Sequence, residues 1–338
     1  PYPWERYDFI VLPASFPLGG MENPRMTFLT PTLLAGDRSL VSVLAHELAH
    51  SWTGNLVTNA NNEHFWLNEG WTVYAERRIL EVLYGAEVAR EDAVLGRVSL
   101  EETLAERAAA GLSNALVYPQ AGLDPDHEFS KVPYEKGFLL VSALERSVGR
   151  KSFDAFIRDY MGAHAFTSIT TEDFAAFVAE KLPDSRVDVA AGTVTEDLPA
   201  DAPRFDAPRL DALRELALAW PAGARPSPGW STTEILYYLS QLLDLDADDC
   251  VALADGLGIS DTRNAELQSA WLARAAAADV DGLEERLREF LGRVGRTKLV
   301  RPVVRAMRGS TRWTELAEEL VEANWSRWHS STRIALSG

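Results

Sequence analysis

The segment His46-Glu47-Leu48-Ala49-His50 places two histidines four residues apart, with a glutamate directly after the first. Residues at positions i and i+4 of a helix project from one face, so both imidazoles can bind the same metal ion. Glu47 lies beside that face, where its carboxylate can accept a proton from a metal-activated water without binding the metal. The spacing therefore predicts a metal site in which Glu47 is the general base.

A third ligand is available at Glu69, which follows His50 after eighteen intervening residues and lies at the start of the next expected helix. Two antiparallel helices bring such a residue back to the ion held by the first helix. Two histidines and one glutamate leave one coordination position open for water, as in catalytic zinc sites. We therefore expect one Zn²⁺ per chain and hydrolysis of an amide bond, although cobalt or manganese can fill such a site in vitro. The alternative, an amphipathic helix whose histidines only form hydrogen bonds, is weak once Glu69 is included.

Glu76 follows Glu69 by seven residues, two helical turns further along the same face. A carboxylate at this place can orient a ligand histidine from behind the metal. A single acid on a helix is also commonly a solvated surface group, so both interpretations stay open at this point.

The remaining pattern predicts mainly helices. Short apolar runs broken by Pro, Gly and Asn indicate strands and turns at about 7–32, the only β region expected. Apolar residues at spacings of three and four predict a buried helix of about four turns at 39–53, and Asn68 is expected to cap a second helix that runs toward Gly85. Further helices are expected at about 87–110, 132–148, 151–163 and 171–182.

A chain of 338 residues with 46% hydrophobic and 25% charged residues is typical of a soluble globular protein with two domains. Periodicity fades between about 183 and 208, where Pro, Asp, Ala and Thr accumulate, and short amphipathic helices typical of a stacked helical array follow. We therefore expect a catalytic domain at 1–190, a linker at 191–207 and a carboxy-terminal helical domain at 208–338.

The net charge of -17 and the pI near 4.8 argue against nucleic-acid binding. Apolar runs are too short for a membrane span, and the single cysteine, Cys250, favours a cytoplasmic setting without disulfides. Because the chain lacks an initiator methionine and opens almost directly into a strand-like run, we expect a fragment whose preceding domain is missing.

The segment Gly19-Gly20-Met21-Glu22-Asn23-Pro24 resembles the exopeptidase motif of the gluzincin zinc aminopeptidases, the family of aminopeptidase N. The resemblance continues through 47–58 (Glu-Leu-Ala-His-Ser-Trp-Thr-Gly-Asn-Leu-Val-Thr) and 65–70 (Phe-Trp-Leu-Asn-Glu-Gly), and it is nearest to the leukotriene hydrolase/aminopeptidase subgroup. It implies a thermolysin-like zinc peptidase domain followed by a helical-repeat domain, an α-α superhelix. A β-rich domain precedes these two domains in the family.

The resemblance also implies how substrate is bound. The glycines of the motif belong to an edge strand that pairs with the substrate backbone, and Glu22 matches the residue that binds the free α-ammonium group. A carboxylate beside the scissile bond favours short peptides with a free amino terminus and does nothing for an internal peptide bond, whereas the zinc motif alone also fits endopeptidases. The positions that match this part of the substrate site are Gly19, Gly20, Met21, Glu22 and Asn23.

Two further segments match the family. Val132-Pro133-Tyr134-Glu135-Lys136-Gly137 resembles the segment whose tyrosine donates to the oxyanion, which gives Tyr134 that role. Gly295-Arg296-Thr297-Lys298 resembles the subgroup's basic pair, so Arg296 and Lys298 are expected to hold the substrate carboxylate. Exposed basic residues in a turn are also commonly just solvated.

Some positions depart from the subgroup. Asp126 matches an acid that the subgroup uses in epoxide hydrolysis and substrate binding, but Phe129 stands where those hydrolases have tyrosine. Leu18 replaces an aromatic residue of the first side-chain pocket. Two alternatives to the aminopeptidase therefore stay open: a bifunctional enzyme that also hydrolyses a lipid epoxide, and an inactive zinc-containing binding module.

Overall fold

The computed structural model describes residues 2–124, 128–221, 229–259 and 262–337. The chain divides into two compact units: the first consists of Pro1–Asp8, Glu22–Thr27 and Ser42–Ala207, and the second of Phe9–Met21, Phe28–Val41 and Pro208–Gly338. Helices dominate and the strands are short, which confirms the expected mainly α fold with a small β region. The predicted division at 191–207 stays a prediction. None of the described helices is long and apolar enough to cross a membrane.

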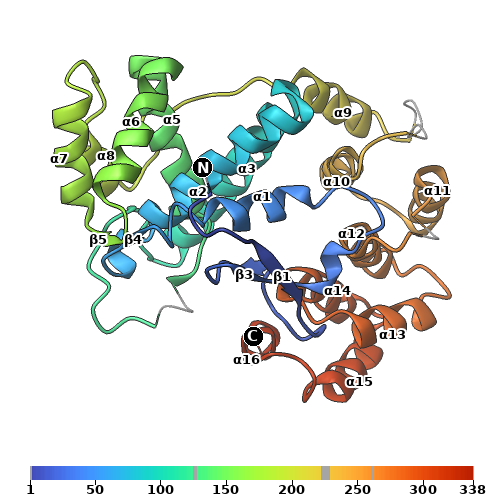
Figure 1. The fold of residues 1–338 in the computed structure, drawn as a ribbon. Helices are drawn as coiled ribbons and strands as arrows, with labels where there is room; N and C mark the ends of the chain where they lie inside the picture. The colour runs from blue at the N-terminus through green and yellow to red at the C-terminus, as the bar shows by residue number, and fades with distance from the viewer. Residues whose placement is uncertain (1, 125–127, 222–228, 260–261, 338) are drawn as a thin grey trace. The chain divides into compact units, whose positions relative to one another are not determined.

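Helix α2 (Trp66–Tyr84) is the centre of the first unit because it packs against α3, α5 and the π-helix η3. Its residue Trp71 is buried and stacks on the rings of Phe153 and Tyr160, at centroid distances of 5.8 and 5.4 Å. Figure 1 shows α5 to α8, in green, gathered together in this unit. The other elements of this part of the chain are α1 (Val41–Ala49), β4 (Val57–Asn59), η2 (Asn62–His64), α3 (Ala86–Ala109), η3 (Val132–Lys136), α5 (Gly137–Val148), α6 (Arg150–Ala163), β5 (Thr167–Ile169), α7 (Thr171–Lys181) and α8 (Val189–Val194).

The prediction that Asn68 caps α2 is wrong, because the helix begins earlier. The side chain of Asn61 accepts a hydrogen bond from the backbone N–H of Glu63 and starts the 3₁₀ turn η2, which leads directly into α2 at Trp66. Asn68 therefore lies inside the first turn of the helix and is buried. The first helix is also shorter than predicted, since α1 has nine residues, about two and a half turns.

A second β region was not expected from the sequence. Strands β4 and β5 pair in parallel, with Val57 opposite Thr167 and Asn59 opposite Ile169. Each strand has only three residues, too few to display an alternating pattern that sequence periodicity can detect. The expected helix at 132–148 is present as two consecutive pieces, the π-helix η3 and then α5.

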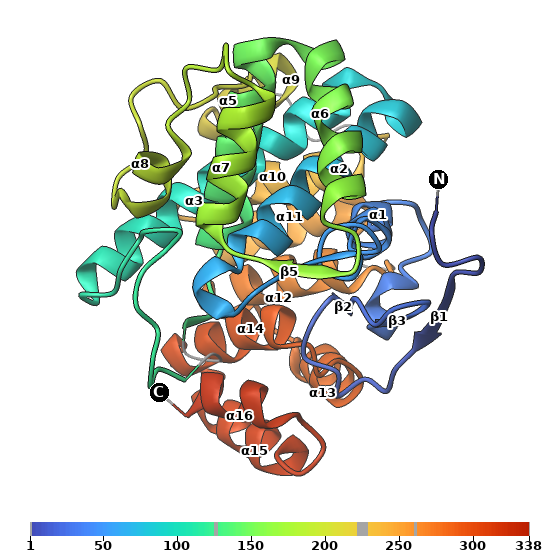
Figure 2. The same ribbon diagram turned by 60° about the vertical axis from the view of Figure 1, so that its left-hand side comes forward.

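The second unit contains most of a three-stranded sheet and all the later helices. The strands β1 (Asp8–Val11), β3 (Met26–Leu29) and β2 (Gly20–Met21) lie side by side in that order, so β2 is an edge strand, as Figure 2 shows. Among the helices, α12 packs against α14, and α14 against α15 and α16. The helices are α9 (Pro208–Leu218), α10 (Thr232–Gln241), α11 (Ala247–Leu257), α12 (Ala265–Ala277), α13 (Glu284–Arg293), α14 (Thr297–Gly309), α15 (Thr314–Asn324) and α16 (Ser330–Leu336).

Candidate active site

His46, His50 and Glu69 converge in the first unit. The Nε2 atoms of His46 and His50 are 3.1 Å apart, and Oε2 of Glu69 lies 3.2 and 3.5 Å from them. Zinc bonds of about 2.0–2.1 Å in a tetrahedral arrangement separate ligand atoms by about 3.3 Å. The three atoms are therefore already spaced as zinc ligands.

The Nδ1 atoms of the two imidazoles, which face away from Glu69, each have a hydrogen-bond acceptor. Nδ1 of His46 lies 3.0 Å from Oε2 of Glu76, and Nδ1 of His50 lies 2.9 Å from the backbone carbonyl oxygen of Thr53. Since both partners are acceptors, each Nδ1 carries a proton and each Nε2 of a neutral imidazole presents a lone pair. Two lone pairs and the carboxylate of Glu69 then face one another, an arrangement that requires a cation between them.

The electrostatics of the site agree with this requirement. Burial lowers the pKa of His46, but hydrogen bonds and charge from Glu69 and Glu76 outweigh burial and raise it well above its ordinary value. Burial raises the pKa of Glu69, but the two imidazoles outweigh burial and lower it. In a metal-free site a proton supplies the positive charge that these groups attract, and the same groups suit a divalent metal ion.

Glu47 is buried on the side of α1 next to the ligands, with only 6% of its surface exposed. Its Oε2 has no hydrogen-bond partner among the described residues. Burial raises its pKa to about 7, against the lowering effect of His46 and His50. A carboxylate that titrates near neutral pH suits a general base.

Glu22 reaches the same site. Its carboxylate, the carboxylate of Glu47 and an imidazole nitrogen of His50 supply atoms that lie within 4.8 Å of one another. Asn55 donates from Nδ2 to the backbone carbonyl of Glu22 at 2.8 Å, and Asn68 donates to Oε1 of Glu22 at 3.4 Å. The residue is therefore fixed both by its backbone and by its side chain.

Tyr134 lies beside His46. The two rings are nearly parallel, with centroids 6.1 Å apart and an interplanar angle of 19°. Burial raises the pKa of Tyr134 well above its ordinary value, and the neighbouring carboxylate of Glu69 raises it further. The hydroxyl therefore keeps its proton and is a donor near the predicted metal position.

Several residues of this site were missed or misinterpreted from the sequence. Asn55 has no pattern of its own, and Asn68 was interpreted as a cap. The hydroxyls of Thr53 and Thr72 lie 2.6 Å apart, and that of Thr72 is 3.1 Å from Nδ1 of His50. Thr53 acts through its backbone carbonyl, which any residue type can supply, so no sequence signal indicates it.

The other predicted site residues are distributed over both units and a segment outside the described residues. Gly19, Gly20 and Met21 belong to the second unit, and Asp126 lies outside the described residues. Asn23 belongs to the first unit, and its buried Nδ2 has no partner among the described residues. In the second unit, Nη1 of Arg296 and Nζ of Lys298 each lie 2.9 Å from the carboxylate of Glu266. These two cations therefore already share one buried acid.

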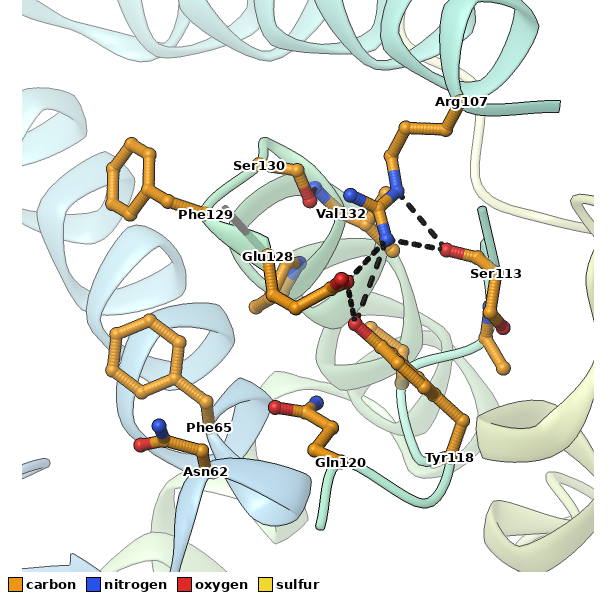
Figure 3. A pocket seen from close by; sticks show the side chains of 13 residues that line it. Asn62, Phe65, Arg107, Ser113, Tyr118, Gln120, Glu128, Phe129, Ser130 and Val132 are labelled. Atoms are coloured by element: carbon orange, nitrogen blue, oxygen red, sulfur yellow. Dashed lines mark hydrogen bonds and ion pairs between the residues drawn. The ribbon is translucent and has the colours of Figure 1, made fainter. Parts of the chain in front are cut away.

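A cavity of about 190 Å³ lies next to Tyr134. Figure 3 shows the guanidinium of Arg107 between Glu128, Tyr118 and the backbone carbonyl of Ser113. Phe65 and Phe129 also line the cavity. The centroids of their rings lie 6.2 and 5.8 Å from the ring centroid of Tyr134, in edge-to-face contacts. The cavity thus has an aromatic edge toward Tyr134 and a buried ion pair further in.

Comparison with known proteins agrees with these features. Residues 1–192 match the peptidase family M1 domain, and residues 230–337 match the leukotriene A4 hydrolase C-terminal domain. Leucine aminopeptidase 2 of Neurospora crassa is 39% identical over 98% of this chain and 52% of its own length, and human aminopeptidase B is 38% identical over 98% and 55%. The structure of yeast LTA4 hydrolase in complex with bestatin superposes with a TM-score of 0.91 at 33% identity, over 99% of this chain and 59% of that one. The chain spans about half the length of these curated relatives. It belongs to peptidase family M1.

Proposed function

We propose that the chain is the catalytic part of a zinc aminopeptidase, which removes single residues from the free amino end of short peptides. The observation that carries the proposal is the close placement of two acids around His50. Glu47 is buried and its Oε2 has no hydrogen-bond partner in the described part of the chain, and Glu22 is held by two asparagines. A general base alone suits any peptidase, whereas a second carboxylate beside it is a site for an α-ammonium group. The names of the relatives, leucine aminopeptidase and aminopeptidase B, support the same substrate class.

We propose one zinc ion per chain, held by His46, His50 and Glu69. Zinc held by these residues would polarise a carbonyl and would lower the pKa of water from 15.7 to about 7. Glu76 and the carbonyl of Thr53 keep the two imidazoles in the tautomer and orientation that binding requires.

The protein groups then divide the chemistry among themselves. Glu22 binds the free amino group and so fixes which peptide bond reaches Glu47. Glu47 takes a proton from the attacking water and delivers it to the departing amine. Tyr134, protonated because it is buried, donates a hydrogen bond to the oxygen that becomes negative.

We assign the backbone of Gly19, Gly20, Met21 and Asn23 to binding of the extended peptide. The edge position of β2 supports this, because the side of the strand away from β3 pairs with no other strand of the described sheet. We assign Arg296 and Lys298 to the far carboxylate of the substrate and Asp126 to substrate binding, from the family resemblance alone. A cytoplasmic setting is supported by the single cysteine, Cys250, which is buried.

Hydrolysis of a lipid epoxide is the second candidate. The match of residues 230–337 to the leukotriene A4 hydrolase C-terminal domain and the similarity to the yeast structure favour it. The cavity beside Tyr134 has a volume of about 190 Å³, below the range of about 300–1,000 Å³ that is usual for small-molecule ligands, so this cavity alone does not accommodate a lipid chain. The ion pair of Arg107 and Glu128 inside the cavity is also a poor match for an apolar chain.

The test is release of free amino acid from a tripeptide and from its amino-acetylated twin, by zinc-loaded protein with and without a chelator. We expect chelator-sensitive cleavage of the free tripeptide only, and loss of that activity in Glu47→Gln protein that still holds zinc. Cleavage of both peptides would identify an endopeptidase. Cleavage of neither, by protein that holds stoichiometric zinc, would point to a need for the part of the relatives that this chain does not span, or to the binding module.

A further inference from the structure

Tyr134 sits in an unusual backbone segment. The five residues Val132–Lys136 form a π-helix directly before α5. A π-helical turn is rare and frequently lies at a functional site. The segment therefore needs contacts that hold it in this form, and the residue next to Tyr134 makes the most specific of them.

Glu135 binds Arg77 of α2 through both carboxylate oxygens. Nη1 of Arg77 lies 2.9 Å from Oε2 of Glu135 and Nη2 lies 3.1 Å from Oε1, which is the parallel two-bond arrangement of arginine and carboxylate. Nε of Arg77 binds Oδ2 of Asp92 at 2.8 Å, and the guanidinium lies 4.1 Å from the ring centroid of Phe138. Arg77 is buried, so its orientation is fixed on every side.

The ion pair of Arg77 and Glu135 packs directly against Gly96, which has no side chain to displace it. A Cβ atom at Gly96 of α3 would collide with both Nη2 of Arg77 and Oε2 of Glu135. Any other residue at this position in α3 would push the ion pair apart. Three elements, α2, α3 and η3, thus meet at one pair of side chains.

The pair links Tyr134 to the metal ligands through α2. Arg77 directly follows Glu76, whose carboxylate holds His46, and the same helix carries Glu69. Replacement of a buried ion pair by apolar residues is often neutral or stabilising, so stability alone is a weak reason for such a pair. The geometry of the ion pair instead suits a positional role. The pair holds the π-helical turn that contains Tyr134 in place against α2, the helix that supplies Glu69 and Glu76.

We propose that Arg77 and Glu135 are positioning residues, which hold the π-helical turn so that the hydroxyl of Tyr134 points to the oxyanion position. The proposal rests on the function proposed above for Tyr134. Neither residue touches the substrate. Loss of the pair displaces the tyrosine by a fraction of an ångström to an ångström, which is enough to cost roughly 10- to 100-fold in rate.

The kinetic test compares Glu135→Gln, Tyr134→Phe and the double variant. Glutamine places an N–H group against the guanidinium, so the two-bond contact is lost while side-chain size is kept. We expect kcat to fall roughly 10- to 100-fold in Glu135→Gln with KM within about twofold, and about 100- to 1,000-fold in Tyr134→Phe. The double variant should be no slower than Tyr134→Phe alone. Multiplied losses in the double variant would overturn the proposal.

Tyr74→Phe is the matched control. It removes two part-buried hydrogen bonds of the same helix, in which the hydroxyl of Tyr74 donates to Glu145 at 2.8 Å and accepts from Arg78 at 2.9 Å, and neither bond involves η3. We expect a loss of thermal stability with an unchanged kcat. Should Glu135→Gln fail to fold, Arg77→Lys gives the same test, because lysine keeps the charge and loses the planar fork.

A second measurement separates this proposal from the proposed function. Fluorotyrosine incorporated at Tyr134 reports on the ring's surroundings by fluorine NMR, whether or not the protein cleaves peptides. We expect a shifted and broadened resonance in the Glu135→Gln background and an unchanged one in the Tyr74→Phe background. An unchanged resonance in Glu135→Gln would overturn the positioning role, while an inactive wild-type enzyme with the expected resonances would overturn only the proposed function.

Discussion

Two buried glutamates, Glu69 in the first unit and Glu266 in the second, meet positive partners in different ways. Burial raises the pKa of both, and in both the partners outweigh burial and lower it. The partners of Glu266 are the cationic side chains of Arg296 and Lys298. Those of Glu69 are two imidazoles, each with a lone pair on the facing nitrogen when neutral.

The difference shows which buried acid is available for chemistry. Glu266 is neutralised within the chain by two cations, so its cluster keeps one positive charge and needs no cation from outside. Glu69 and the imidazoles form a set of donors that is completed only by a cation from outside. Burial and ion pairing look alike in the two regions, and only the protonation chemistry of the partners separates a metal site from a cluster of ion pairs.

The largest expected effect comes from Glu69→Gln, which removes the charge of the ligand set and leaves Glu266 intact. We expect zinc affinity to fall by more than about 100-fold, since loss of even an outer partner costs about 10- to 100-fold. Metal content after dialysis measures it. Glu266→Gln is the control and should keep its zinc; equal retention in both variants would mean that the two acids do not differ as described.

Glu76→Gln tests whether a residue that hydrogen-bonds to a ligand histidine contributes to zinc affinity. Its carboxylate lies 3.0 Å from Nδ1 of His46, and glutamine keeps the size but loses the charge that fixes the tautomer. We expect zinc affinity to fall about 10- to 100-fold, as is typical of outer-shell partners. Competition with a coloured chelator gives the affinity. Glu81→Gln, an acid further along α2 that binds Arg150, should leave it unchanged.

The sequence predicted much of this site because its chemistry is local. His46, Glu47, His50 and Glu69 lie on two helices whose spacing determines the faces they share, and Glu76 follows from the same helical period. Their convergence is what the structure adds. Sequence could not predict the carbonyl of Thr53 or the role of Asn55, because a backbone oxygen carries no residue signature and a polar contact with Glu22 depends on the fold.

The fold was predictable to the same extent and for the same reason. Long helices such as α3 and α7 follow from periodicity, and the expected ranges match them closely. Strands β4 and β5 are too short to show a period. The predicted start of α2 is too late because the short 3₁₀ turn before it shows no periodicity, and its only sequence feature is the capping residue Asn61. The partner of Arg296 and Lys298 was missed since Glu266 precedes them by some thirty residues on another helix.

Glu266→Gln sharpens the comparison through stability. The change removes the charge that two cations share and is expected to lower the free energy of unfolding by about 2 kcal/mol, the range for hydrogen bonds to charged groups. Because the folded pKa of Glu266 is lowered, its contribution is present above the unfolded pKa of about 4.3 and is lost as pH falls through the folded value. Urea unfolding at pH 7 and at pH 3 measures both. A wild-type advantage that does not shrink at the lower pH would contradict the assignment.

The smallest effect is expected at Lys298, which contacts Glu266 but has a side chain that is 65% exposed. Lys298→Ala should change stability by less than about 0.5 kcal/mol, because an exposed ion pair contributes little. If Lys298 also holds the far carboxylate of the substrate, KM for a tripeptide should rise about two- to fivefold, the equivalent of up to about 1 kcal/mol, while KM for the same tripeptide with an amidated carboxyl end stays constant. An equal rise for both substrates would assign Lys298 to the structural cluster of Glu266 and leave recognition of the carboxylate to other residues.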